Sequence, residues 1–200
     1  MMRASIPMGR RVLIPVGLVM LAVATVLTWD AVTVGRPLDA YRGVTVFDNG
    51  LLFFRGRGRH VSPEGYYLGQ KWQCVEYIKR FYFEVARHRM PDPMGHARDF
   101  FDPAVTHGAL NPRRGMLQFR NGGEVAPLPG DLLVFRDTTY GHVAIVTAET
   151  TNSIEVIQQN IFGRTRQRFE LQHEAGRVWI TSPREPAGWL RLPAAAAQPR

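Results

Sequence analysis

The stretch from residue 12 to residue 29 restricts the fold of this chain most, because its 18 consecutive residues carry no formal charge. As an α-helix the stretch would extend about 27 Å, close to the roughly 30 Å hydrocarbon core of a bilayer. Three arginines precede it within residues 1–11. Basic residues of this kind stay in the cytoplasm. We therefore predict a cytoplasmic basic segment (1–11), a single transmembrane helix (12–29) and a periplasmic remainder attached to a bacterial inner membrane.

A cleaved signal peptide is the competing interpretation of the same stretch. Ala22-Val23-Ala24 has the small-x-small pattern of a cleavage site. The apolar run nevertheless continues as far as Trp29, whereas a cleavage region is usually more polar. We favour the anchor, but both interpretations export the rest of the chain, the second as a secreted protein.

The rest of the chain has room for one domain. We expect a linker over 30–43, the domain over 44–191 and a flexible tail over 192–200. Of the 200 residues, 45% are hydrophobic and 21% are charged, which is ordinary globular composition. The single cysteine excludes an intramolecular disulfide and a cysteine-based zinc cluster. We expect neither a metal nor a cofactor.

The formal net charge of +8 favours contact with anionic surfaces. Arg55, Arg57 and Arg59 could in principle contact RNA. In an exported protein, phospholipid or an anionic polymer is a better partner for them, and a solvated loop is the simplest interpretation of all. We therefore expect no nucleic acid partner.

Hydrophobic periodicity predicts a helix over residues 72–89, followed by a series of strands. One apolar face of this helix would comprise Cys74, Tyr77, Ile78, Phe81 and Val85. The opposite, solvated face would comprise Glu76, Lys79, Arg80, Glu84 and Arg87. A second short helix is predicted over 96–101. Short β runs follow Pro129, at 131–136, 142–148, 154–160, 164–171, 177–181 and 188–191. Helices followed by consecutive strands indicate an α+β domain with an antiparallel sheet.

Cys74 is the candidate nucleophile. An isolated cysteine is most often a small buried hydrophobic residue. Cys74, however, lies at the predicted start of a helix, where free N–H groups and the helix dipole favour a thiolate. Its place on the apolar face would direct the sulfur toward the sheet.

His142 opens one predicted strand and is the candidate base. If a turn near Thr151 joins this strand to the next, His142 lies opposite Gln158 or Asn160. Strand side chains alternate, so these three residues would share one face and Gln159 would take the other. One imidazole nitrogen could then be held by an amide oxygen while the other faces Cys74, as in a cysteine hydrolase.

These residues resemble a known family. The segments Trp72-Gln73-Cys74-Val75-Glu76-Tyr77, Tyr140-Gly141-His142-Val143-Ala144 and Gln158-Gln159-Asn160 look like a CHAP domain. This is the cysteine- and histidine-dependent amidohydrolase/peptidase family of the papain-like superfamily. The segment from Lys71 to Glu76 is especially similar to the amidase domain of glutathionylspermidine synthetases. The resemblance extends over residues 44–191.

The resemblance implies that Cys74 is the nucleophile and His142 the base. The third position of the family is usually Glu, Asp or Asn, whereas here it is Gln158, with Asn160 two residues later. A neutral amide fixes the imidazole tautomer but stabilises imidazolium less than a carboxylate does. We expect Gln158 to make the direct contact and Asn160 to support it. By analogy with papain-like enzymes, the Gln73 side chain and the Cys74 N–H are candidate oxyanion donors.

The predicted fold is therefore a papain-like CHAP domain, with a Cys-bearing helix packed on an antiparallel sheet and one transmembrane helix before it. The predicted function is that of a membrane-anchored, extracytoplasmic cysteine amidase or endopeptidase that forms a Cys thioester and acts on peptidoglycan peptides. The first alternative is an amidase acting on a glutathione- or polyamine-type conjugate. The second is an inactive envelope-binding module, which the neutral Gln158 favours.

Overall fold

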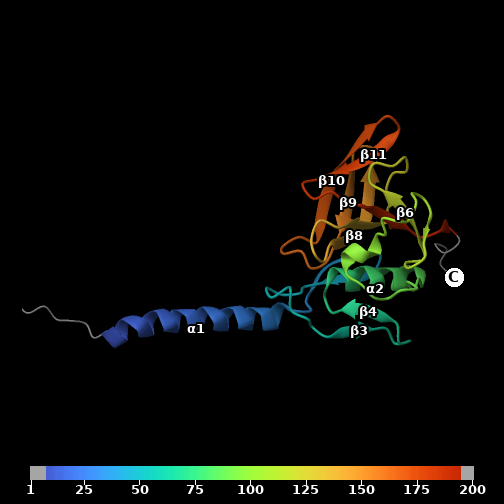
Figure 1. Cartoon of the computed structure of the whole chain (residues 1–200). Helices are drawn as coiled ribbons and strands as arrows, with labels where there is room; N and C mark the ends of the chain where they lie inside the picture. The colour runs from blue at the N-terminus through green and yellow to red at the C-terminus, as the bar shows by residue number, and fades with distance from the viewer. Residues whose placement is uncertain (1–7, 195–200) are drawn as a thin grey trace, which may run out of the picture.

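A computed structural model describes the backbone of residues 8–194 and the side chains of residues 16–194. Most of the predicted basic segment, residues 1–7, and most of the predicted tail, residues 195–200, lie outside the described residues. The first element is α1 (Met8–Thr33). Figure 1 shows it projecting from one side of the folded part as a separate rod.

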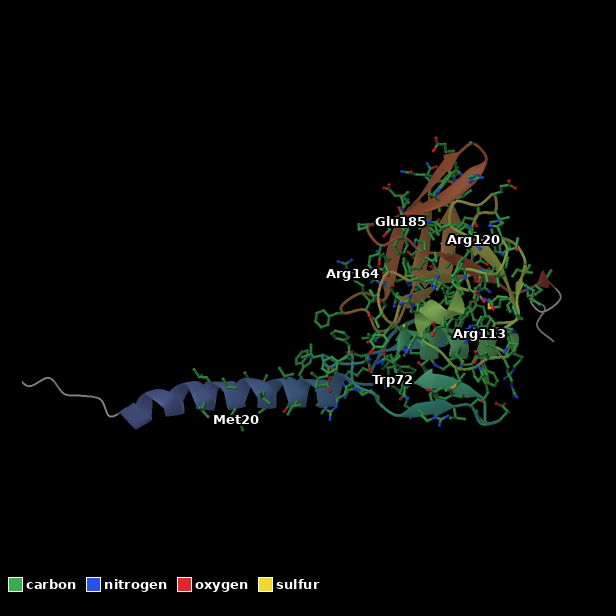
Figure 2. The ribbon with its side chains drawn as sticks, in the orientation of Figure 1. Met20, Trp72, Arg113, Arg120, Arg164 and Glu185 are labelled. Atoms are coloured by element: carbon green, nitrogen blue, oxygen red, sulfur yellow. The ribbon has the colours of Figure 1, made fainter. Side chains whose placement is uncertain are left out.

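From Val16 to Trp29, α1 carries mostly apolar side chains, and all of these are exposed. Figure 2 shows Met20 pointing away from the rest of the molecule. Within the described residues, α1 is the one helix long and apolar enough to cross a membrane, over Val16–Thr33. A signal sequence would pass the same test of length and composition. The prediction of a membrane-spanning helix at this place is thus supported by length and composition.

An antiparallel sheet of eight strands makes up most of the domain. Its strand order is β11-β10-β9-β8-β7-β12-β6-β5, and every pair of neighbouring strands is antiparallel. The strands are β5 (Leu110–Asn111), β6 (Met116–Arg120), β7 (Leu132–Phe135), β8 (His142–Thr150), β9 (Ser153–Ile157), β10 (Arg166–Glu174), β11 (Arg177–Thr181) and β12 (Gly188–Arg191). The prediction of an α+β fold with an antiparallel sheet is confirmed.

The sheet is curled, and a separate group of buried apolar side chains lies on each of its two faces. The loop after β6 reaches β11, where the Gly122 N–H donates to the Val178 carbonyl and the Val178 N–H donates to the Gly123 carbonyl. One buried group, including Leu133, Ala144 and Trp189, lies on the concave side. The other lies under a helix and includes Ile145 and Leu132.

That helix is α2 (Cys74–Ala86), and it is covered on two sides. It packs on β8 and also on β2 (Val44–Phe47) and β4 (Tyr67–Gln70). Figure 1 shows it between the large sheet and the hairpin that β4 forms with β3 (Arg59–Val61). A short 3-10 turn, η1 (Ala97–Phe100), occupies the place of the second predicted helix.

The second cover explains an error in the prediction for α2. Glu76, Lys79 and Arg80 were expected to face solvent, but their exposed fractions are 0%, 1% and 4%. The amino group of Lys79 donates to the carbonyls of Tyr67 and Pro93, and burial lowers its pKa to about 8. Helical periodicity identified the face toward the sheet but could not show that a hairpin covers the other face.

Strand β1 (Pro37–Tyr41) lies in the segment that was expected to be a linker. It pairs with β2 in an antiparallel hairpin, and Asp39 forms a salt bridge with Arg166 of β10, with N and O 2.9 Å apart. Residues 30–43 therefore contain the end of α1 and a folded strand. The helix α1 passes almost directly into the domain.

Candidate active site

The thiol of Cys74 lies where the start of α2 meets the start of β8. Gln73, the residue before the helix, has extended backbone angles. Within the described part of the chain, no side chain caps the first N–H groups of α2. The backbone N–H groups of Cys74 and Val75 are therefore free to donate to the sulfur, as is the N–H of Val143. Because Val143 follows His142 directly, this contact brings the two predicted catalytic residues together.

Burial, rather than the helix dipole, dominates the acidity of Cys74. The side chain packs against the core group under α2. Desolvation raises the pKa of the thiol to about 11, while the three backbone N–H groups act in the opposite direction. The N–H groups at the helix start thus lower the pKa of the thiol, as expected, but by less than burial raises it.

His142 is the first residue of β8 and is 6% exposed. The residue before it, Gly141, has φ +70°, and a Cβ there would lie 2.5 Å from the backbone oxygen of Phe135 and the nitrogen of Arg98. Only glycine fits this turn without displacing the histidine. Burial lowers the pKa of His142 to about 4, so the imidazole is neutral near pH 7.

Gln158 is the residue that holds the imidazole. Its Oε1 lies 3.0 Å from Nε2 of His142, and its side chain is 2% exposed. A carbonyl oxygen accepts, so Nε2 carries the imidazole proton and Nδ1 is left with a lone pair. The Gln158 amide nitrogen donates in turn to Oε1 of Gln167, 3.4 Å away. An amide thus occupies the third position and fixes the tautomer in which Nδ1 can accept a proton.

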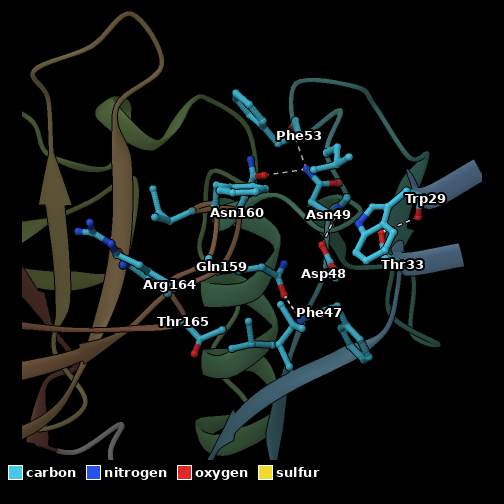
Figure 3. Close-up of a pocket in the computed structure, with 18 residues that line it drawn as sticks. Trp29, Thr33, Phe47, Asp48, Asn49, Phe53, Gln159, Asn160, Arg164 and Thr165 are labelled. Atoms are coloured by element: carbon cyan, nitrogen blue, oxygen red, sulfur yellow. Dashed lines mark hydrogen bonds between the residues drawn. The ribbon is translucent and has the colours of Figure 1, made fainter. Parts of the chain in front are cut away.

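Asn160 does not take up the place expected for it beside His142. Strand β9 ends at Ile157, so side-chain alternation does not continue to residue 160, and Asn160 has φ +64°. Its Nδ2 donates to Oε1 of Gln73 at 2.6 Å, and its Oδ1 accepts from Nδ2 of Asn49 at 2.9 Å. Figure 3 shows the bond between Asn49 and Asn160. The prediction that Asn160 shares the face of His142 is wrong, because its contacts orient Gln73.

Gln73 has its amide held at both ends. Oε1 accepts from Asn160, and Nε2 donates to the carbonyl of Phe53 at 3.0 Å. The second hydrogen on Nε2 remains for another acceptor. Gln73 is also the neighbour of Cys74 in the chain. Its role as an oxyanion donor stays a prediction, and its two hydrogen bonds fix the orientation of the amide.

A buried ionic cluster beneath the site was missed by sequence reasoning. Glu76 accepts from Nε of Arg80 at 2.6 Å and from Nε2 of Gln159 at 2.8 Å, and Nδ1 of His60 lies 2.8 Å from it. Burial acts to raise the pKa of Glu76, but these partners outweigh it and the pKa is lowered. The four-residue spacing of Glu76 and Arg80 was the one available signal, and it also fits an exposed pair.

Gln159 connects this cluster to the site. Its Nε2 also donates to the backbone oxygen of Gln73 at 3.1 Å, and its Oε1 accepts from the N–H of Phe47 at 2.7 Å, a bond drawn in Figure 3. Three successive side chains thus contact three parts of the site. Gln158 binds His142, Gln159 binds the start of α2, and Asn160 binds the Gln73 side chain.

Two cavities border this segment. The larger, of about 580 Å³, is shown in Figure 3 and lies between the end of α1 and the loops 46–53 and 158–165. The smaller, of about 240 Å³, is lined by His142 and Gln158 together with Phe135, Phe169 and Arg184. The described residues hold no group of three or more His, Cys, Asp or Glu side chains that could bind a metal ion.

Comparison with known proteins places Cys74, His142 and Gln158 in a family. Residues 65–160 match the family model of the CHAP domain. This segment is a CHAP domain. Its limits include Gln73, Cys74, His142, Gln158 and Asn160, so the resemblance found in the sequence motifs is confirmed.

The curated relatives are much longer proteins than this chain. The chain is 37% identical over 102 residues to the bifunctional glutathionylspermidine synthetase/amidase of Escherichia coli (strain K12), covering 48% of this chain and 16% of that protein. It is 26% identical over 151 residues to the trypanothione synthetase of Crithidia fasciculata, covering 68% and 23%. The chain thus spans less than a quarter of the length of either relative.

Among solved structures, that of Ly7917 aligns with 68% of this chain and 56% of its own, at 13% identity and a TM-score of 0.35. An alignment this loose transfers neither fold nor function. The CHAP domain assignment depends on the family match and on the curated relatives.

Proposed function

We propose that this chain is a cysteine hydrolase of amide bonds, with Cys74 as nucleophile, His142 as base and Gln158 as the residue that orients the base. The observation that carries the proposal is the pairing of His142 with Gln158 at 3.0 Å, beside a thiol that contacts the N–H of Val143. The CHAP domain and the match to a protein named as an amidase support the same reaction class.

The reaction starts from a neutral pair. As the sulfur of Cys74 forms a bond to the amide carbon, the thiol proton passes to Nδ1 of His142. Negative charge develops on the carbonyl oxygen, where the N–H of Cys74 and the second Nε2 hydrogen of Gln73 can donate. When the C–N bond breaks, His142 returns the proton to the leaving amine and a thioester remains.

Deacylation repeats the proton transfer with water. His142 takes a proton from water as the oxygen attacks the thioester carbon, the C–S bond breaks, and the proton returns to the sulfur. Because Gln158 is neutral and the pKa of His142 is lowered to about 4, the imidazolium form exists only transiently. This distinguishes the site from one that rests as a thiolate–imidazolium ion pair.

We propose peptidoglycan peptides as the substrate and the periplasmic face of a bacterial inner membrane as the location. The support is α1, which is apolar over Val16–Thr33, and the arginines that precede it in the sequence. A chain secreted after signal cleavage would meet the same polymer. The domain would act on peptide cross-bridges or stem peptides near the membrane.

The test is digestion of purified peptidoglycan by the full chain in detergent, beside Cys74→Ala, with products identified by mass spectrometry. New amino termini from the wild type and none from the variant are expected. Parallel incubation with a glutathione–polyamine conjugate separates the alternatives. Cleavage of the conjugate alone would overturn the peptidoglycan proposal, and cleavage of neither by folded protein would overturn the enzyme and favour an envelope-binding module.

A further inference from the structure

Five exposed apolar side chains lie near the point where α1 enters the domain. Trp29 is 57% exposed, Leu38 54%, Phe53 50%, Phe54 75% and Phe162 76%. They come from the end of α1, from β1, from the loop after β2 and from the loop between β9 and β10. We call these five residues the apolar ring.

The members of the apolar ring lie around one opening. Trp29, Leu38, Phe53 and Phe162 all line the cavity of about 580 Å³, and the ring of Phe54 lies 5.8 Å from that of Phe53. Figure 3 shows Trp29 on the side of the cavity nearest α1. Exposed apolar residues scattered singly need no explanation, but a contiguous group indicates a binding surface.

The position of this surface relative to α1 is fixed by a buried ion pair. Asp30, the residue after Trp29, is 3% exposed and lies 2.6 Å from the guanidinium of Arg57. The N–H of Leu52 donates to the same carboxylate at 3.0 Å. Gly50 has φ +75°, and a Cβ there would lie 2.2 Å from Oδ1 of Asp30, so the loop approaches the helix as closely as glycine allows.

The loop after β2 and the loop between β9 and β10 both extend toward the side from which α1 leaves the domain, as Figure 1 shows. A membrane crossed by α1 would therefore meet them beside the last turns of the helix. Exposed basic side chains lie on the same segments, namely Arg36, Arg55 and Arg164. Figure 2 shows Arg164 on the side of the domain that faces α1. Aromatic side chains with nearby arginines are typical of surfaces that lie in the headgroup region of anionic bilayers.

We propose that the apolar ring lies in the headgroup region of the membrane that α1 spans, and that the three arginines contact anionic phospholipids there. This inference rests on the membrane anchor of the proposed function. The occupant of the surface is the bilayer itself, because the apolar ring lies beside the end of the helix that would enter it. The catalytic domain is thus held against the membrane and does not swing on a linker.

The surface also leads directly to the active site. The carbonyl of Phe53 accepts from Nε2 of Gln73 and from Nδ2 of Asn49, and Asn49 in turn donates to Asn160. The loop that would contact lipid is therefore the loop that orients the predicted oxyanion donor. Amides close to the membrane surface would be the ones presented to Cys74.

Fluorescent labelling of single cysteines tests the inference in the full chain. The background is Cys74→Ala, which leaves no other cysteine, and the variants are Phe54→Cys, Phe162→Cys, Met20→Cys and Leu110→Cys. Each carries an environment-sensitive nitrobenzoxadiazole label and is reconstituted into phosphatidylethanolamine–phosphatidylglycerol vesicles. Brominated acyl chains then report contact with lipid. Met20 tests the anchor, and Leu110, which is 52% exposed on β5, is the matched exposed control.

We expect quenching at least twofold stronger at positions 54 and 162 than at position 110, together with strong quenching at position 20. Strong quenching at 20 with positions 54 and 162 equal to 110 would overturn this inference and leave the anchor standing. Equal quenching at 54, 162 and 110 at a high level would also overturn it. Absence of quenching at 20 would overturn the anchor and this inference together, while the hydrolase assay remains an independent test.

Discussion

The imidazole Nε2 of His142 lies 3.0 Å from Oε1 of Gln158, and both side chains are buried. A neutral amide therefore occupies the place where a carboxylate could have stabilised imidazolium. The contact selects the tautomer with a free Nδ1 but adds no negative charge. Burial of the imidazole lowers the pKa of His142, and the hydrogen bond to Gln158 offsets only part of that effect.

Two replacements of Gln158 distinguish its role in orienting the imidazole of His142 from the effect of a negative charge at this position. Gln158→Ala leaves the Nε2–H without its acceptor, and we expect kcat to fall roughly 100-fold, the low end of what general acid–base catalysis contributes. Gln158→Glu retains an acceptor and adds a charge, so the pKa of His142 should rise from about 4. Imidazole titration by NMR measures the pKa, and amide hydrolysis measures kcat. Equal kcat in Gln158→Ala and wild type would contradict the orienting role.

The pH dependence of Cys74 alkylation tests the resting state of the thiol. Because burial raises the pKa of Cys74 to about 11, thiolate is scarce at pH 7 and becomes more abundant with every unit of pH. The rate of reaction with iodoacetamide should therefore rise about tenfold per pH unit up to pH 10. The chain unfolded in urea is the control and should level off near the ordinary thiol pKa of about 8.5. A plateau already reached at pH 7 would instead indicate an ion pair with His142.

Asn160 should affect catalysis without affecting the base. Asn160→Gly suits the positive φ of this position and removes the hydrogen bond to Gln73, so the Gln73 amide is freed to rotate. We expect kcat to fall by about tenfold, less than the roughly 100-fold or more caused by loss of an oxyanion donor in Gln73→Ala. The pH profile of Cys74 alkylation should not change.

The double variant provides the control for this interpretation. If Asn160 acts through Gln73, then Asn160→Gly should cost little in the background of Gln73→Ala. Additive losses would show that Asn160 acts by another route. A shifted alkylation profile in Asn160→Gly would restore the contact with His142 that the sequence had suggested.

The sequence predicted those features that repeat along a single element. The apolar positions from Cys74 to Val85 indicated the helix face on β8, and alternation across a hairpin placed Gln158 opposite His142. The same alternation failed for Asn160, because β9 ends at Ile157 and the chain turns through a left-handed residue. A pattern of period two carries no information beyond the end of the strand.

Features that depend on a third element could not be read from local patterns. The acidity of Cys74 is decided by how completely the sheet and loops exclude water, and this outweighs the N–H groups at the helix start. Likewise, residues 30–43 were expected to be a linker. They are instead attached to the domain by strand β1 and by the ion pair of Asp30 with Arg57. In each case the decisive neighbour is distant in the sequence.

Glu76 provides the last prediction, because it is fully buried and charged. Glu76→Gln would leave Arg80 without its counter-ion, and breaking a buried pair in this way costs about 3 kcal/mol or more. The Tm of the full chain at pH 7 should then fall by roughly 6–12 °C. Glu84→Gln is the matched control on the exposed side of the same helix, and it should shift Tm by no more than about 2 °C.

The sign of the pH effect distinguishes loss of charge from loss of packing. The partners of Glu76 lower its pKa, so its stabilising effect is present above the unfolded pKa of about 4.5 and is lost as the pH falls through the lower folded value. The Tm difference between wild type and Glu76→Gln should therefore shrink below pH 4. A difference that stays constant from pH 7 to pH 3 would show that the carboxylate charge is not what stabilises the cluster.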